Sequence, residues 1–162
     1  MKAKDLMIPI QDFLRPENTL KDAVNLLKIA RRDVERQGVK GLPVLDAHQK
    51  VIGILSMQDI LKAVYPSYMS MMNLGNFTWD GMVESLAKRA GNERVAAHMS
   101  REVMTVQEDD SLMECVDLMI KHHVKRLPVL NQTGKVVGMI YERDVFYAIT
   151  SAMLDENQGC GQ

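Results

Sequence analysis

The chain has 162 residues, of which 46% are hydrophobic and 25% are charged, as in an ordinary globular domain. Its formal net charge of −1 at pH 7 gives no electrostatic reason to expect nucleic acid or an anionic membrane as a partner. No apolar run approaches the roughly 20 residues that span a bilayer. The two cysteines, Cys115 and Cys160, lie far apart and predict neither a disulfide framework nor a zinc site. We therefore expect a cytoplasmic protein with reduced thiols.

The first long helix is predicted to begin at Thr19. The segment Thr19-Leu-Lys-Asp22 matches the capping-box pattern, in which a hydroxyl and a carboxylate satisfy the free N–H groups at a helix start. Apolar residues then recur at helical spacing at Leu20, Ala23, Val24, Leu27 and Ala30. We expect this helix to continue through residues 30–36 and to stop near Gly38.

A β-hairpin and a second helix are predicted next. Apolar runs at 42–45 and 51–55 flank the polar residues 46–49, a pattern typical of two strands joined by a turn. A helix opens near Ser56. The predicted unit is helix–strand–strand–helix, with a short extended segment ahead of it.

A connector rich in methionine and aromatic residues occupies 65–94 and contains the only tryptophan, Trp79. At about 30 residues it exceeds the usual connection length, which indicates a functional element or a packed insertion. Its last part predicts a short helix ending at Gly91, from the spacing of Met82, Val83, Leu86 and Ala90.

The second half of the chain repeats the first. The segment 125–149 matches 40–64 without a gap at an offset of 85, sharing Leu42/Leu127, Pro43/Pro128, Val44/Val129, Gly53/Gly138 and Asp59/Asp144. Further upstream the offset is 92, which places Thr19 over a second capping box at Ser111. The difference between the offsets means that copy one carries seven extra residues. Such a duplication predicts two units that share a core, with a cleft between them as the first place to look for function.

The repeated pattern is Leu-Pro-Val, then Gly, two hydrophobic residues, a hydroxyl or aromatic residue, two variable positions and Asp. It resembles the tandem cystathionine-β-synthase (CBS) domain pair, or Bateman module. The resemblance implies an α/β fold of α+β type with two pseudo-symmetric repeats, each a small sheet packed with two helices. We expect the repeats at 2–64 and 95–150, the helical insertion at 65–94 and a flexible tail at 151–162.

The resemblance also implies a function. Such pairs are non-catalytic, ligand-sensing regulatory modules that signal by conformational change, and many bind an adenine nucleotide (AMP, ADP or ATP) in the cleft between the repeats. No cofactor is required. A homodimer is the expected assembly, with an unidentified regulated protein as a further partner.

Seven residues fall on the expected ligand-binding positions: Ser56, Asp59, Lys125, Arg126, Tyr141, Arg143 and Asp144. By resemblance, Asp59 and Asp144 would accept hydrogen bonds from ribose hydroxyls, as acceptor-only carboxylates can. Ser56 would lie near a phosphate together with Lys125, Arg126 and Arg143. Copy two departs from the pattern at Tyr141, where a small hydroxyl residue is usual, and copy one departs at Gly41, which aligns with Arg126.

Alternatives remain at this stage. Helix capping alone accounts for Ser56 and Asp59, and Arg126 could pair with a carboxylate on the surface. The chain could instead be an interaction or dimerisation module without a nucleotide, docking a partner through 65–94. An enzyme is the least supported reading, because no nucleophile–base pair, P-loop or metal-ligand spacing is present.

Overall fold

The computed structural model describes residues 1–30, 38–65 and 82–154. The chain divides into two compact units, one formed by 11–103 and the other by 1–10 together with the chain from 104 onwards. Each unit therefore includes a short segment of the other sequence copy: residues 95–103 belong to the first hairpin's unit, and residues 1–10 belong to the second's.

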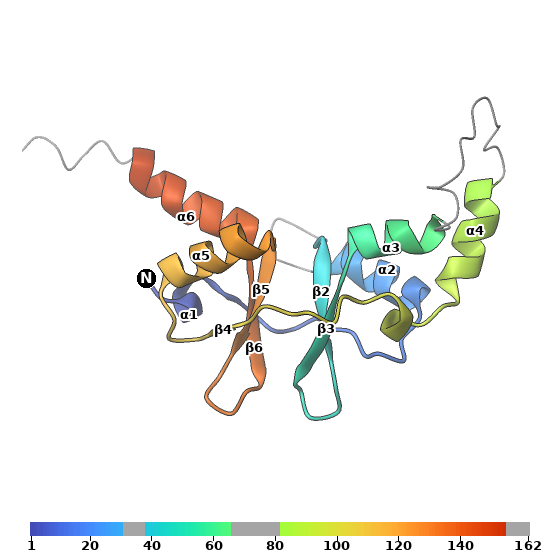
Figure 1. The fold of residues 1–162 in the computed structure, drawn as a ribbon, viewed down its shortest axis with the longest axis horizontal. Helices are drawn as coiled ribbons and strands as arrows, with labels where there is room; N and C mark the ends of the chain where they lie inside the picture. The colour runs from blue at the N-terminus through green and yellow to red at the C-terminus, as the bar shows by residue number, and fades with distance from the viewer. Residues whose placement is uncertain (31–37, 66–81, 155–162) are drawn as a thin grey trace, which may run out of the picture. The chain divides into compact units, whose positions relative to one another are not determined.

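The unit 11–103 is built on an antiparallel hairpin. Strands β2 (Gly41–Leu45) and β3 (Val51–Ser56) pair with Leu42 opposite Leu55. Isolated bridges extend this pairing on both sides, from Leu14 to Val44 and from Ser100 to Ile54. The helices of this unit are α2 (Leu20–Ile29), α3 (Met57–Val64), α4 (Met82–Gly91) and the 3₁₀ turn Val95–Ala97 (Figure 1).

The other unit repeats this plan with a fuller sheet. Its strand order is β1 (Ile8–Pro9), β6 (Val136–Tyr141), β5 (Arg126–Leu130) and β4 (Val106–Gln107). Only β4 and β5 run parallel. The helices are α1 (Ala3–Leu6), α5 (Leu112–His122) and α6 (Glu142–Leu154). The predicted α+β plan of two like units, with a helix in the connecting segment, is confirmed.

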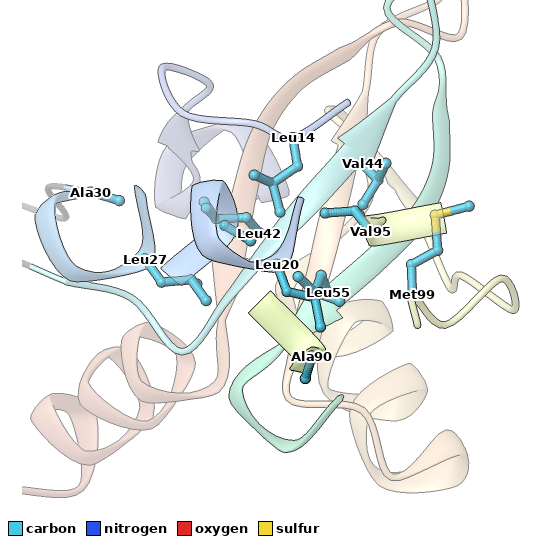
Figure 2. Close-up of a cluster of buried hydrophobic side chains, with 11 residues drawn as sticks. Leu14, Leu20, Leu27, Ala30, Leu42, Val44, Leu55, Ala90, Val95 and Met99 are labelled. Carbon is cyan, nitrogen blue, oxygen red and sulfur yellow. The ribbon is translucent and has the colours of Figure 1, made fainter. Parts of the chain in front are cut away.

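Each unit has its own hydrophobic core. In the unit 11–103, side chains from α2, the hairpin, α4 and the 3₁₀ turn converge, as Figure 2 shows for Leu20, Leu42, Leu55, Ala90 and Val95. The apolar spacing that predicted α2 is thus the spacing of its buried face. In the other unit, the corresponding cluster consists of Ala3, Val106, Cys115, Met119, Leu127, Val129, Ile140 and Val145. Burial raises the pKa of the Cys115 thiol, as expected of a core cysteine.

The shared glycine of the repeat lies where another segment crosses its strand. A Cβ atom built on Gly53 would lie 2.6 Å from Met99 Sδ, and one on Gly138 would lie 2.7 Å from Met7 Sδ. Met7 and Met99 are themselves related by the offset of 92. The glycine is needed for this close approach, because neither Gly53 nor Gly138 has a positive φ.

The prediction that α2 continues through residues 30–36 is wrong at its first residue, Ala30. The helix ends at Ile29, and Ala30 is its C-cap with ψ of 126°. Gly38 N donates to Ala30 O at 2.6 Å, and Val39 N donates to Leu27 O at 3.0 Å, so the chain returns to the helix end. Residues 31–37 lie outside the described residues.

The seven extra residues of copy one therefore fall at 31–37, after the helix cap. Gly38 has φ of 90° and aligns with His123, the left-handed C-cap of α5 with φ of 53°. A left-handed residue lets the following N–H groups reach the last carbonyls of a helix. Both copies thus have a left-handed residue at this aligned position, and the seven extra residues of copy one come immediately before it.

The structure describes the connector at Tyr65 and over residues 82–94. Helix α4 confirms the predicted helix ending at Gly91, and its Ala90 is buried in the core. Trp79 and the neighbouring aromatic and methionine residues of 66–81 lie outside the described residues. Among the helices that the structure describes, none combines the length and hydrophobicity needed to cross a membrane.

Candidate functional site

In the unit 11–103, the predicted residues lie where β3 passes into α3. Ser56 is the N-cap of α3, and Asp59 occupies the third helical position. Asp59 Oδ2 accepts hydrogen bonds from Ser56 N at 2.8 Å and from Ser56 Oγ at 2.9 Å, while Asp59 N donates to Ser56 Oγ at 3.4 Å. The predicted capping box is therefore present.

This capping box differs from those that begin α2 and α5. The carboxylates of those boxes, Asp22 and Glu114, are exposed, whereas Asp59 is half-buried. Asp59 Oδ1 receives no hydrogen bond from any residue that the structure describes. An ionised carboxylate has about four acceptor positions. Asp59 therefore combines a fixed orientation with an oxygen that can accept hydrogen bonds from a ligand.

The two departures from the repeat pattern, Gly41 and Tyr141, belong to the same cross-strand position of their respective hairpins. Gly41 is the cross-strand partner of Ser56, and Arg126 is the cross-strand partner of Tyr141. The backbone beside each pair is the same, since Lys40 O accepts from Met57 N at 2.9 Å and Lys125 O accepts from Glu142 N at 2.8 Å. One position of a shared framework thus carries two small residues in copy one and two large ones in copy two. We call these positions the hairpin corners.

In copy two, the corner is occupied by its own side chains. Tyr141 is 9% exposed, and Arg126 Nε and Asp144 Oδ2 are both shielded from solvent. Asp144 holds the third position of α6, as Asp59 does in α3. Arg143 and Lys125 are exposed. The Arg143 Cζ atom lies 5.4 Å from the centre of the Tyr147 ring, and Arg143 Nη2 donates to Tyr147 Oη at 3.1 Å.

The structure thus divides the seven predicted residues between the units. Ser56 and Asp59 lie together in one, and the remaining five lie around the equivalent corner of the other. Gly41 was noted in the sequence only as a departure from the pattern. Its pairing with Ser56 follows from the register of the hairpin, because Leu42 is opposite Leu55. No group of three metal-ligating side chains occurs among the described residues.

A sequence profile of the CBS domain matches residues 3–66 and 94–151, which together make up most of the chain. The chain belongs to the CBS domain family. The match falls on both repeats, so the protein contains a CBS pair, and the family resemblance seen in the sequence is confirmed.

Curated relatives include proteins of different lengths. The uncharacterized protein MJ1426 of Methanocaldococcus jannaschii is 27% identical over 141 residues, covering 79% of this chain and 81% of that protein. The chloroplastic CBS domain-containing protein CBSX2 of Arabidopsis thaliana is 27% identical over 153 residues, covering 89% of this chain and 61% of that protein. An inosine-5′-monophosphate dehydrogenase of Methanocaldococcus jannaschii is 24% identical over 144 residues, but this CBS pair spans only 23% of the enzyme's length.

The fold is shared with solved CBS-pair structures. The crystal structure of CBSX2 in complex with AMP superposes with a TM-score of 0.65 and 24% sequence identity, covering 94% of this chain and 98% of that one. At this identity the likeness establishes the fold of the CBS pair.

Proposed function

We propose that this CBS pair is a non-catalytic regulatory module that binds an adenine nucleotide and signals by a change of conformation. The observation that carries the proposal is the half-buried Asp59 carboxylate, whose Oδ1 atom receives no hydrogen bond from the described residues. The ribose of a nucleotide offers two neighbouring hydroxyl donors, and hydrogen bonds to an ionised acceptor are about twice as strong as neutral ones.

The remaining roles follow the arrangement at the two hairpin corners. Ser56 lies at the N-terminus of α3, where a phosphate is favoured by the helix dipole. Asp144 is the second candidate for the ribose. Lys125, Arg126 and Arg143 supply positive charge for phosphate groups, which arginine binds through paired N–H donors. AMP in the CBSX2 complex supports an adenine nucleotide as the ligand class.

We propose that the protein regulates a partner and does not catalyse a reaction of the nucleotide. The match to inosine-5′-monophosphate dehydrogenase covers less than a quarter of that enzyme, so its chemistry does not pass to this chain. A ligand that binds one conformation more tightly than another shifts the population between them. The regulated partner would read this shift.

We also propose that the module is a homodimer. Helix α6 exposes Phe146, Met153 and Leu154 by 59%, 73% and 77%, and α3 exposes Leu61 by 67%. Large apolar side chains exposed to this extent on a helix are typical of surfaces that another subunit covers. Light scattering should give twice the mass of the chain, and Phe146→Ser with Leu154→Ser should lower it to that of one chain. Monomeric wild-type protein at micromolar concentration would refute the proposal.

The nucleotide proposal is tested by thermal shift with adenosine, AMP, ADP, ATP, S-adenosylmethionine and guanine nucleotides. A ligand at 100 times its dissociation constant should stabilise the protein by about 2.7 kcal/mol. Asp59→Asn should reduce the shift, because asparagine keeps one oxygen for the helix cap and replaces the other with a donor. Asp22→Asn alters a similar capping box without the site and is the matched control.

Two results would contradict the nucleotide proposal. One is the absence of any shift with all the compounds, and capture of a partner through 65–94 under the same conditions would then favour the docking function. The other is hydrolysis or transfer of the nucleotide by the pure protein, which would make it an enzyme.

A further inference from the structure

The two hairpin corners have the same backbone but opposite side-chain content. In copy one, Gly41 contributes no side chain and Ser56 contributes only a hydroxymethyl group, and these two residues are cross-strand partners. In copy two, the partners Arg126 and Tyr141 are among the largest side chains available. Because both residues of the cross-strand pair differ, the side chains on both strands of the hairpin corner change together.

The acceptor carboxylates also differ. Asp59 Oδ1 is left without a hydrogen bond from the described residues, while Oδ2 is engaged by Ser56. The equivalent Asp144 has its Oδ2 atom shielded from solvent. A carboxylate oxygen that a ribose must reach cannot be covered by the protein's own atoms. In copy two, Asp144 Oδ2 is therefore closed to a ribose hydroxyl.

Charge and packing point the same way in copy two. Arg126 Nε and Asp144 Oδ2 are both shielded from solvent at this corner. Tyr141 is 9% exposed and adds a phenol ring at the position that Ser56 holds in copy one. The corner of copy two already contains an aromatic ring, a cation and an anion.

We infer that each chain binds one adenine nucleotide, at Ser56 and Asp59, and that Arg126 with Tyr141 acts as a built-in plug that prevents a second from binding at Asp144. The inference rests on the proposed function and assigns its ligand to one of the two corners. It replaces the ligand-contact roles given above to Arg126 and Asp144, and it makes Arg126 and Tyr141 residues that determine the stoichiometry.

Isothermal titration of the full chain with AMP tests this assignment. We expect one AMP per chain. Asp59→Asn should weaken binding at least about tenfold, because it removes a charge-assisted acceptor. Asp144→Asn should leave the dissociation constant within about twofold and the stoichiometry unchanged, since this carboxylate would not touch the ligand.

Exchanging the two corners gives a second, independent measurement. The double variant Arg126→Gly with Tyr141→Ser gives copy two the residues of copy one, and its stoichiometry should rise from one to two. Gly41→Arg with Ser56→Tyr places the plug in copy one and should abolish binding. Circular dichroism must show that each variant is folded. If neither exchange variant folds, the Asp59 and Asp144 variants still decide the matter, since asparagine can retain the cap.

Each outcome has a definite meaning. Two AMP molecules per wild-type chain, or binding that depends on Asp144 and not on Asp59, would overturn the plug and leave the regulatory nucleotide function intact. No heat of binding and no thermal shift with any nucleotide would instead refute the proposed function, and the plug with it.

Discussion

Replacing Gly138 with alanine should destabilise the unit formed by 1–10 and 104–154 by about 1–3 kcal/mol, the usual cost of overpacking. The added Cβ would lie 2.8 Å from the carbonyl oxygen of Ile8, as well as 2.7 Å from Met7 Sδ. Ordinary contacts are about 3.5–4.0 Å. The sulfur can move, but the Ile8 carbonyl belongs to β1, which is paired with β6 at this position.

The same change at Gly53 is the matched comparison. Its new Cβ would meet Met99 Sδ at 2.6 Å, but the nearest backbone atom, Ser100 O, lies at 3.1 Å. A flexible methionine can move away. The loss of conformational freedom in the unfolded chain also favours alanine by about 0.4–1 kcal/mol. We therefore expect Gly53→Ala to cost less than about 1 kcal/mol.

Urea unfolding monitored by circular dichroism measures the loss of stability in both variants. A shift of the transition midpoint, with an unchanged dependence of the unfolding free energy on urea concentration, gives the change in stability. Adding Met99→Ala to Gly53→Ala should show a favourable coupling energy, since the clash is mainly with that side chain. Adding Met7→Ala to Gly138→Ala should recover only part of the loss, because the clash with Ile8 remains. A Gly138→Ala protein as stable as the wild type, or a larger cost at Gly53, would refute this account of the repeated glycine.

Three further predictions concern stability. Deleting residues 1–10 removes β1 and α1 with their buried side chains and should lower the free energy of unfolding of this unit by about 5 kcal/mol. In hydrogen exchange, the amides of β5 and β6 should lose protection while those of β2 and β3 keep it. Protection retained in β6 would contradict this prediction. The hydrogen bond and charge of Lys4 lower the pKa of Asp109. The ionised Asp109 therefore stabilises the folded protein above the ordinary carboxylate pKa of about 3.9, and this stabilisation is lost as the pH falls and the carboxylate is protonated. Asp109→Asn should therefore lower the melting temperature slightly at pH 7 but not at about pH 2.5, and an equal effect at both values would refute it. His123→Gly relieves a left-handed backbone and should stabilise by up to about 1 kcal/mol, whereas Gly38→Ala should destabilise by a similar amount.

Local patterns in the sequence predicted the secondary structure well. The capping boxes, the apolar spacing of α2 and α5 and the paired apolar runs are short-range signals, and the described elements follow them. The predicted continuation of α2 through Ala30 was wrong, because it rested only on the length of the insertion, and seven residues happen to equal about two helical turns. The left-handed Gly38, aligned with His123, marks where the repeat resumes after the insertion.

The site was predicted less completely, for a different reason. The repeat identified Asp59 and Asp144 as equivalent candidate ligand-binding residues. It did not reveal that the side chains surrounding the two carboxylates differ. Shielding of Arg126 and Asp144 depends on packing in three dimensions. The pairing of Gly41 with Ser56 agrees with the register in which Leu42 is opposite Leu55, and a slip of one residue would turn one strand's side chains to the other face.

The division of the chain into the unit 11–103 and the unit formed by 1–10 and 104 onwards also sets the order in which the two units can fold during synthesis. All residues of the unit 11–103 are available once residue 103 has emerged, whereas β1 must wait for β6, more than 120 residues later. During that interval the first ten residues have no strand to pair with. A newly made chain should therefore protect β2 and β3 first and its own N-terminus last, although chains generally fold from the N-terminal end.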